Sequence, residues 1–276
     1  MPATIAPYRV DSEGEEIYAE VIDTAEPGRE TVVLSHGAGG THAAWFNQVP
    51  VLAQQYRVVT WDSRGFGNST NRNDMVGPAA AATDLRAVLD AVGVAEPVHL
   101  VGQSMGGWHM VEFALDHPDR VRSLALCDTI GSLYTDELRT HFEAFMSKGG
   151  LGAARGGPGS PQELGVHTAI SAANLAANPT LGFLYQQLGS FHSPPMKLIG
   201  PALAGTAHRH AEVEALGVPV LFLVGRDDQI FPAPLLAASA QLLPGATFVE
   251  IDDAGHSPYF EQPVAFNEAL IRFLGD

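Results

Sequence analysis

The sequence has few of the residues on which several large classes of protein depend. It contains one cysteine, Cys127, and a single thiol can form neither an intramolecular disulfide bond nor a thiolate metal cluster. Lysine and arginine number 15 against 31 aspartates and glutamates, so the formal net charge is −16. Because nucleic acids and anionic lipid surfaces are bound by clustered cationic side chains, this charge argues against both as partners.

Long apolar runs are also absent from the 276 residues. No stretch approaches the roughly 20 consecutive apolar residues of a membrane-spanning helix. The first residues, MPATIAPYRVDSEGEE, are too polar and acidic for a secretory signal peptide, so we expect a cytoplasmic protein. Hydrophobic residues still make up 46% of the chain and charged residues 17%, which is typical of a globular protein.

Short β-branched runs alternate with alanine-rich, helix-like stretches along most of the chain. This alternation predicts an α/β protein with a mostly parallel sheet flanked by helices. The predicted strands are Ile17–Ile22, Thr31–Ser35, Arg57–Trp61, Val98–Val101, Val121–Cys127, Val218–Val224 and Thr247–Ile251. The predicted helices between them are Pro78–Val92, Met105–Asp116, Pro234–Leu242 and Pro263–Leu274.

The alternation stops between Thr129 and about Leu216. A crossover between parallel strands needs only about a dozen residues, so this segment predicts an inserted helical unit. We therefore expect a core of residues 1–130 and 217–276 and a helical cap of residues 131–216. Within the cap, the glycine-rich stretch Gly149–Gly159 predicts a mobile loop. It follows no strand and precedes no Lys-Ser/Thr pair, so it does not fit a phosphate-binding loop.

The strongest local signal is the sequence Gly-Gln-Ser-Met-Gly at residues 102–106. It follows an apolar strand and leads into a helix-like stretch. Glycines two residues before and two after Ser104 permit a tight strand-to-helix turn that exposes the serine hydroxyl. The helix N-terminus beside it offers free N–H groups to a developing oxyanion. This pattern predicts Ser104 as a nucleophile.

A serine hydroxyl needs a histidine base and a carboxylate that orients the base. His256 is the best candidate base, because it lies in a loop between the last predicted strand and the last helix. Asp228 is the best candidate acid, because it closely follows another apolar strand. All three residues follow predicted parallel strands, and an open α/β sheet places its site at that edge.

With these motifs the chain resembles the α/β-hydrolase superfamily over nearly its whole length. The matching segments occur in the family's order: residues 35–40 (SHGAGG), 61–69 (WDSRGFGNS), 102–106, 225–228 (GRDD) and 255–256 (GH). Within the superfamily the chain looks most like the capped lactonases, carboxylesterases and carbon–carbon-bond hydrolases. The order Ser104, Asp228, His256 is also the order of the family's triad.

The resemblance implies further roles. The family's oxyanion hole uses the backbone N–H of the residue after the nucleophile, here Met105, and one from the His-Gly loop. The second donor corresponds to Ala38, within one position. His36 is expected to hold that loop by hydrogen bonds, and Arg64 to be an ion-pair partner rather than a substrate ligand. No cofactor is implied.

A second acid remains open in the sequence. Asp128 follows the strand Val121–Cys127, and some superfamily members carry their acid after that strand. We favour Asp228 because its motif fits better. Cys127 reads as a buried small apolar residue rather than a nucleophile. The pair His208 and His210 has no neighbouring carboxylate cluster, so no metal site is expected.

Aromatic residues concentrate around the nucleophile motif and in the predicted cap, which favours an apolar or aromatic substrate. The residues expected to line its pocket are Gly39, Trp45, Phe46, Trp108, Phe142, Phe145, Phe183, Tyr185, Phe191, Phe231 and Tyr259.

The sequence therefore predicts a serine hydrolase that cleaves a small-molecule ester or lactone through an acyl-enzyme. Two alternatives stay open. Carbon–carbon-bond hydrolases share the scaffold, but a tryptophan typically follows their histidine, whereas Ser257 follows His256 here. Some proteins of this fold are ligand receptors that keep the triad. A turnover assay distinguishes a receptor from an enzyme, because a receptor binds its ligand tightly but hardly hydrolyses it. Epoxide hydrolases and dehalogenases use an aspartate where Ser104 stands, which excludes their usual mechanism.

Overall fold

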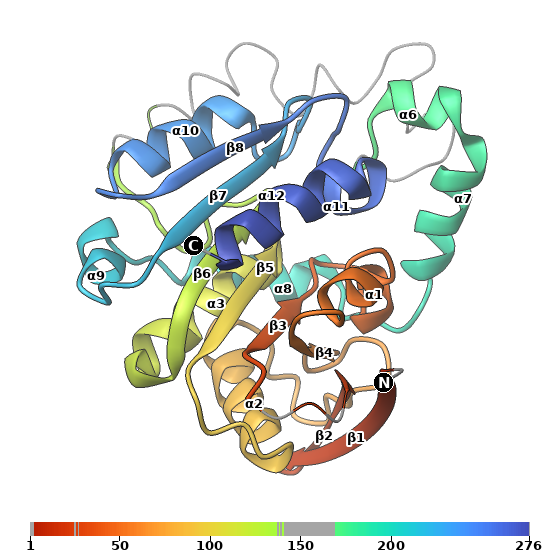
Figure 1. The fold of residues 1–276 in the computed structure, drawn as a ribbon, viewed down its shortest axis with the longest axis vertical. Coiled ribbons are helices and arrows are strands. Elements are labelled where there is room, and N and C mark those ends of the chain that lie inside the picture. The colour runs from red at the N-terminus through yellow and green to blue at the C-terminus, as the bar shows by residue number, and fades with distance from the viewer. Residues whose placement is uncertain are drawn as a thin grey trace.

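The computed structural model describes residues 3–275 except 25, 27, 137, 139 and 141–168. Its described residues form an eight-stranded sheet with the strand order β1-β2-β4-β3-β5-β6-β7-β8 (Figure 1). The strands are β1 (Thr4–Ser12), β2 (Glu15–Asp23), β3 (Thr31–Ser35), β4 (Arg57–Trp61), β5 (Val98–Gln103), β6 (Val121–Cys127), β7 (Val220–Gly225) and β8 (Thr247–Ile251).

The predicted mostly parallel sheet is confirmed. Strands β4, β3, β5, β6, β7 and β8 run parallel to one another, and β2 and β1 join antiparallel beside β4. The register brings the strand ends level, because Ser35 of β3 pairs with Gly102 of β5, and Gln103 of β5 pairs with Cys127 of β6. The loops that leave these strands therefore begin side by side at one edge of the sheet.

Helices cover both faces of the sheet (Figure 1). The described helices are η1 (His42–Trp45), α1 (Val49–Leu52), α2 (Pro78–Ala91), α3 (Met105–Asp116), η2 (Pro118–Arg120), α6 (Ala172–Ala177), α7 (Pro179–Leu188), α8 (Met196–Ala204), α9 (His210–Glu214), α10 (Ala233–Gln241), α11 (Pro258–Glu261) and α12 (Pro263–Gly275). Successive residues of β3 alternate between two core clusters. Val33 belongs to the cluster that contains residues of α2, α3 and α10, whereas Val32 and Leu34 belong to the cluster that contains residues of α1 and α12. This period of two is that of a strand buried on both faces.

The segment between β6 and β7 contains α6 to α9 among its described residues. Part of this insertion contacts loops at the sheet edge: the N–H of Gly67 donates to the carbonyl oxygen of His192 at 2.8 Å, and a Cβ on Gly65 would lie 2.8 Å from Pro194. In contrast, Val213 of α9 belongs to the core cluster that contains α3. Helix α9 thus packs as part of the core, although the predicted boundary assigns it to the cap.

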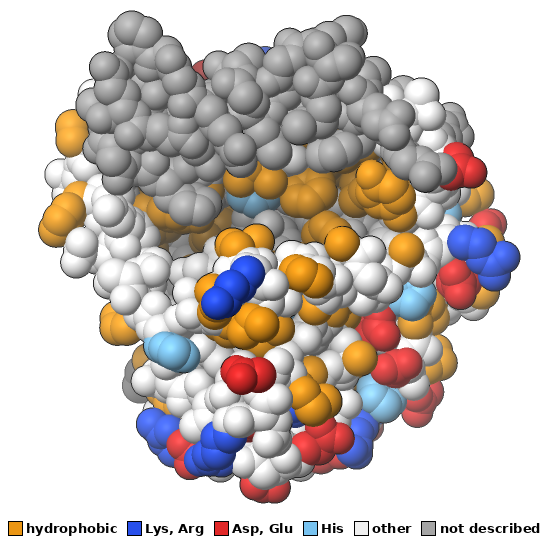
Figure 2. Space-filling view, turned by 180° about the vertical axis from the view of Figure 1, so that it is seen from behind, with side chains coloured by type: hydrophobic (Ala, Val, Ile, Leu, Met, Phe, Trp, Pro, Cys, Tyr) orange, Lys and Arg blue, Asp and Glu red, His pale blue; other side chains and the backbone are white. Residues whose placement is uncertain are grey.

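None of the helices in the described ranges is long and apolar enough to cross a lipid bilayer. Large apolar side chains are nevertheless exposed on and between α7 and α8, among them Phe183, Phe191 and Met196. On the face opposite to that of Figure 1, hydrophobic side chains gather across the middle and charged side chains lie mainly below them (Figure 2).

A buried ion pair joins the turn after β4 to α2. Nε and Nη2 of Arg64 donate to the two carboxylate oxygens of Asp84 at 3.0 and 2.6 Å. The two side chains are 2% and 0% exposed, so the pair is shielded from water. Arg64 is thus engaged as an ion-pair partner, as its place in the sequence predicted.

We predict that Asp84→Ala lowers the free energy of unfolding by about 3–5 kcal/mol, because it leaves the buried Arg64 guanidinium with only the exposed carboxylate of Glu13, at 3.4 Å. Asp90→Ala is the matched control, since it removes exposed contacts to Arg86 and Arg120 at 3.4 and 3.2 Å. Its cost should stay below about 1 kcal/mol. Chemical denaturation measures both values, and equal losses would contradict the importance of the buried pair.

Candidate active site

Ser104 lies at the turn between β5 and α3 in a strained backbone conformation, with φ 50° and ψ −120°. The turn is possible because the residues two positions before and after Ser104 are glycines, which have no side chain. A Cβ on Gly102 would lie 2.4 Å from the carbonyl oxygen of Gly106, and a Cβ on Gly106 would lie 2.3 Å from that of Ser35. The glycines of the motif thus let β3, β5 and α3 meet, and Ser104 remains half-buried at their junction.

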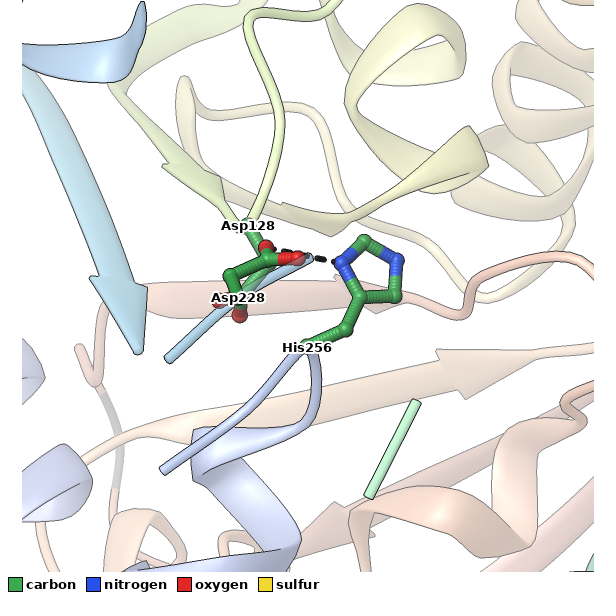
Figure 3. Close-up of side chains that lie close together, drawn as sticks. All are labelled: Asp128, Asp228 and His256. Atoms are coloured by element: carbon green, nitrogen blue, oxygen red, sulfur yellow. Dashed lines mark hydrogen bonds and ion pairs between the residues drawn. The ribbon is translucent and has the colours of Figure 1, made fainter. Parts of the chain in front are cut away.

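Asp228 and His256 are hydrogen-bonded to each other in the loops after β7 and β8. Nδ1 of His256 lies 2.8 Å from Oδ2 of Asp228, and the two side chains point toward each other (Figure 3). Oδ1 of Asp228 accepts the N–H groups of Ile230 and Phe231 at 2.7 and 3.0 Å. These donors hold the carboxylate in place, and Nδ1 acts as the donor to it. The lone pair of the imidazole then lies on Nε2, which accepts no hydrogen bond from the described residues.

The second candidate acid, Asp128, lies at the same place (Figure 3). One of its oxygens, one oxygen of Asp228 and a ring nitrogen of His256 all lie within 4.8 Å of one another. Oδ1 of Asp128 accepts the N–H of Gly225 at 2.9 Å, whereas Oδ2 has no hydrogen-bond partner among the described residues. Burial, and then the negative charge of Asp228, raise the pKa of Asp128 well above its usual range. The surroundings of Asp128 thus favour its neutral form.

The same three side chains are the described group that comes nearest to a metal-ligand set. The oxygens of Asp228 already accept three hydrogen bonds, two from backbone N–H groups and one from His256. The raised pKa of Asp128 disfavours a second negative charge at this place. A divalent cation would have to break the hydrogen bonds that Asp228 accepts, so the arrangement fits an oriented base better than a metal centre.

The two candidate oxyanion donors come from segments in contact. Met105 is the first residue of α3, and Ala38, in the loop after β3, packs against the small cluster that Met105 forms with Phe66 and Ile199. This loop also touches the nucleophile turn, since a Cβ on Gly37 would lie 3.1 Å from the Cβ of Ser104.

His36 holds this loop through both of its ring nitrogens. Nδ1 lies 2.8 Å from the carbonyl oxygen of Gly37 and donates to it, while Nε2 accepts the N–H of Ser63 at 3.0 Å. Burial lowers the pKa of His36, so the ring is neutral and supplies one donor and one acceptor. These bonds join the loops after β3 and β4, which agrees with the structural role expected for His36.

Gln103 is a contributor that the sequence analysis did not single out. Its Nε2 donates to the carbonyl oxygen of His256 at 2.9 Å and so joins the nucleophile turn to the histidine loop. The partner is a main-chain atom 153 residues away, and no sequence pattern signals such a bond. The residue after His256 is Ser257, and its hydroxyl donates to the hydroxyl oxygen of Tyr185 in α7 at 3.1 Å.

A cavity of about 380 Å³ lies beside the loop that carries Ala38. Its described lining comes from that loop, η1, α7 with the residue that follows it, and α11. The lining residues are Ala38, Gly39, Gly40, Ala44, Tyr185, Gln186, Leu188, Gly189, Tyr259 and Phe260. Gly39, Tyr185 and Tyr259 were expected in the pocket and lie in this lining, whereas Ser104 is not part of it.

Two of the predicted pocket aromatics lie beside the imidazole instead. The ring of Phe231 stacks near that of His256, with centroids 6.0 Å apart and an interplanar angle of 25°. The ring of Trp108 packs in turn against that of Phe231, with centroids 5.7 Å apart. These two rings form an apolar wall on the histidine side of the site.

Four others do not meet the expectation, and two cannot be placed. Trp45 is fully buried in the core and lies behind Tyr259, because its ring packs against Tyr259 and Phe266 rather than facing the cavity. Phe46 is 42% exposed, Phe183 64% and Phe191 57%, and none of them belongs to the described lining. Phe142 and Phe145 fall outside the described residues.

Comparison with known proteins agrees with this architecture. A sequence profile of the alpha/beta hydrolase family matches residues 32–269. The chain is 30% identical to a putative carbamate hydrolase of Caulobacter sp. strain K31, over 94% of this chain and 95% of that protein. It is 29% identical to the 2-hydroxy-6-oxononadienedioate/2-hydroxy-6-oxononatrienedioate hydrolase of Paraburkholderia phymatum, over 95% and 92%. An esterase structure from Thermogutta terrifontis matches with a TM-score of 0.79 and 27% identity, over 98% of each chain.

A second buried histidine supports the loops around the site. His109 of α3 has its Nδ1 3.3 Å from the hydroxyl of Ser63 and 3.5 Å from that of Ser35. Burial, with a smaller contribution from His36, lowers the pKa of His109 to about 3. The folded chain therefore keeps this ring neutral at pH values where the unfolded chain, with a histidine pKa near 6.5, binds a proton.

We predict that the chain loses stability as the pH falls below about 6.5, because between the two pKa values the unfolded state holds a proton that the folded state excludes. For His109 alone this loss should reach about 2 kcal/mol at pH 5. Chemical denaturation at pH 7.5 and pH 5 measures it. In His109→Gln the loss between the two pH values should be smaller by about that amount, and an unchanged loss would show that His109 is not the group responsible.

Proposed function

The chain is an enzyme of the alpha/beta hydrolase family, and we propose that it is a serine hydrolase that cleaves a carboxylic ester or lactone of a small, apolar substrate through an acyl-enzyme on Ser104. The observation that carries this proposal is the 2.8 Å bond between Asp228 and Nδ1 of His256 at the sheet edge where the strained Ser104 lies. A nucleophile, a base and an orienting carboxylate are the parts that such a reaction requires.

In the first half-reaction, Nε2 of His256 accepts the proton of the Ser104 hydroxyl while Oγ attacks the substrate carbonyl carbon. The carbonyl electrons move onto oxygen, and the N–H groups of Met105 and Ala38 stabilise that negative charge. When the carbonyl re-forms, the bond to the leaving oxygen breaks and His256 gives it the proton. In the second half-reaction His256 deprotonates water, which attacks the acyl carbon. When the bond to Oγ then breaks, His256 returns the proton to Ser104 and the acid is released.

Asp228 is proposed as the acid of the triad because its Oδ2 accepts the hydrogen bond from Nδ1 of His256, while two backbone N–H groups hold its Oδ1. Asp128 lies nearby but accepts one N–H, and burial raises its pKa, which favours its neutral form. A neutral acid cannot stabilise a positive ring to the same extent.

The cavity beside Ala38 supports a neutral, apolar substrate. Its described lining contains glycine, alanine, leucine, aromatic residues and one glutamine, and no charged side chain. One relative is named for a dioate, whose two carboxylates would need cations that this lining does not offer. The putative carbamate hydrolase is named for a substrate whose carbonyl, like that of an ester or a lactone, can be attacked by serine, so a carbamate belongs in the substrate panel.

We also propose that the β6–β7 insertion acts as a cap over this cavity through the part that precedes α9, because α9 packs with the core. The carbonyl oxygen of Gly39 would lie 3.3 Å from a Cβ on Gly189, so the segment after α7 touches the loop of the oxyanion donor. Tyr185, Gln186 and Leu188 of α7 then form one wall of the cavity.

We predict that a fluorophosphonate probe labels Ser104 and that Ser104→Ala loses both labelling and turnover, because no other nucleophile is proposed. Turnover is measured on p-nitrophenyl esters of graded chain length, a lactone panel and an aryl carbamate. Labelling that survives in Ser104→Ala would overturn the nucleophile. Tight ligand binding by the native protein with no turnover would instead indicate a receptor.

A second pair of variants separates the two acids. Asp228→Asn should reduce turnover by up to about 10⁴-fold, as in serine protease triads, because asparagine no longer favours the required tautomer. Asp128→Asn should change turnover little, since asparagine resembles a neutral carboxyl group in shape and charge. Both variants are first checked for native stability. The reverse ranking would move the acid to the loop after β6.

A further inference from the structure

Glu261 is a buried carboxylate that the proposed mechanism does not use. It is the last residue of α11 and is 8% exposed. Its side chain lies between two segments that are far apart in the sequence: the loop that carries His256, and residues 169–174, here called the α6 lead segment. Each carboxylate oxygen serves one of the two segments.

The hydrogen bonds of Glu261 divide between these segments. Oε1 accepts the N–H of Gly255, the residue before His256, at 2.8 Å. Oε2 accepts the N–H of Ser171 at 2.8 Å and an amide N–H of Asn174 at 2.8 Å. The same Asn174 amide group also donates to the carbonyl oxygen of Asp253 at 2.6 Å. One carboxylate thus joins the insertion to the histidine loop.

Direct packing reinforces this connection. A Cβ on Gly255 would lie 2.9 Å from the nitrogen of Ser171 and 3.4 Å from the carbonyl oxygen of Ala169. The histidine loop and the α6 lead segment are therefore in backbone contact at a position where a larger residue would not fit. On its other side, the loop is held by the bond from Gln103 to the carbonyl oxygen of His256.

Burying the Glu261 carboxylate costs free energy that an apolar residue at this position would not. Burial raises the pKa of Glu261, although the N–H donors from Asn174, Ser171 and Gly255 oppose that rise. No salt bridge to Glu261 occurs among the described residues, so uncharged hydrogen-bond donors compensate for its desolvation. An apolar side chain would fill the space without this cost but could not hold three N–H groups from two segments.

The insertion side of this connection leads to the cavity. Asn178 is both the C-cap of α6 and the N-cap of α7, so it is the single residue between the two helices. Tyr185 and Leu188 of α7 line the cavity. A substrate that moves α7 thereby acts on a segment bonded to Glu261.

We infer that Glu261 is a positioning residue that couples the α6 lead segment to the loop of His256, so that the seating of α6 and α7 over the cavity and the orientation of the catalytic imidazole change together. This inference rests on the proposed function, because it takes His256 as the base. Its consequence is that losing the carboxylate slows the chemistry at Ser104 even though Glu261 does not touch the substrate.

The test is the rate at which a fluorophosphonate labels Ser104, together with kcat on a p-nitrophenyl ester. Glu261→Gln keeps the shape but turns an NH₂ group toward N–H donors. Its labelling rate and kcat should fall about 10-fold to 100-fold, the range expected when a catalytic group is displaced by up to about 1 Å. Measurements are made at a temperature where circular dichroism shows each variant folded.

Two further variants make the result specific. Gln262→Ala is the matched control: it removes a bond to the carbonyl oxygen of Asp253 at 3.1 Å on the same loop and leaves Glu261 intact. Its labelling rate should equal that of the native chain. Asn174→Ala removes the amide group that donates both to Glu261 and to the carbonyl oxygen of Asp253, and leaves the carboxylate its donors Ser171 and Gly255. It should slow labelling by a smaller factor than Glu261→Gln.

The outcomes separate the two proposals. A native chain that is not labelled at all contradicts the proposed function. A labelled native chain with equal labelling in folded Glu261→Gln, even at a lowered melting temperature, overturns the coupling and leaves Glu261 a purely structural residue. If Glu261→Gln does not fold, Asn174→Ala decides, and an unchanged labelling rate in that variant overturns the coupling as well.

Discussion

The backbone of Ser104 is the constraint on which the arrangement of the site depends. A residue held at φ 50° and ψ −120° costs about 1–3 kcal/mol and persists only where its surroundings enforce it. Here the enforcement comes from close contacts at Gly102 and Gly106, where any side chain would overlap the backbone of α3 or β3. The result is a serine raised at the end of β5, directly followed by the free N–H groups of a helix. The proposed nucleophile, Ser104, and one proposed oxyanion donor, Met105, thus come from one turn.

The other groups reach this turn because the parallel strands end level. The loops after β3, β6, β7 and β8 supply Ala38, Asp128, Asp228 and His256. The N–H of Gly225 holds Asp128, N–H groups of its own loop hold Asp228, and the Asp228 carboxylate holds His256. Charge is kept low in this buried region. Three hydrogen-bond donors hold Asp228, whereas burial and the neighbouring Asp228 raise the pKa of Asp128 and so favour its neutral form. His36 and His109 are neutral because burial lowers the pKa of each. A single negative charge beside the imidazole is what an oriented general base needs.

The sequence was sufficient where local patterns carry the information. The strands Thr31–Ser35, Arg57–Trp61 and Val121–Cys127 were predicted with the bounds that the structure gives. Strand β1 was not predicted, because it is an edge strand whose residues are mostly exposed, so no apolar run marks it. The proximity of Asp228 and His256 was predicted from their places after parallel strands. The pocket was predicted less well, since an aromatic such as Trp45 reads the same whether it faces a cavity or the core. Gln103 and Glu261 were missed because no sequence pattern marks their bonds to segments far along the chain, at His256 and at Ser171 and Asn174.

The most direct test of the central claim is detection of the acyl-enzyme. The protein is mixed with a p-nitrophenyl ester, quenched in acid within the first turnover, digested and analysed by mass spectrometry, while the initial release of p-nitrophenol is followed in parallel. Our account predicts an acyl group on the peptide that contains Ser104 and a burst of p-nitrophenol close to one equivalent of enzyme if deacylation is the slower step. Ester cleavage with the acyl group on another residue, Cys127 included, would contradict it.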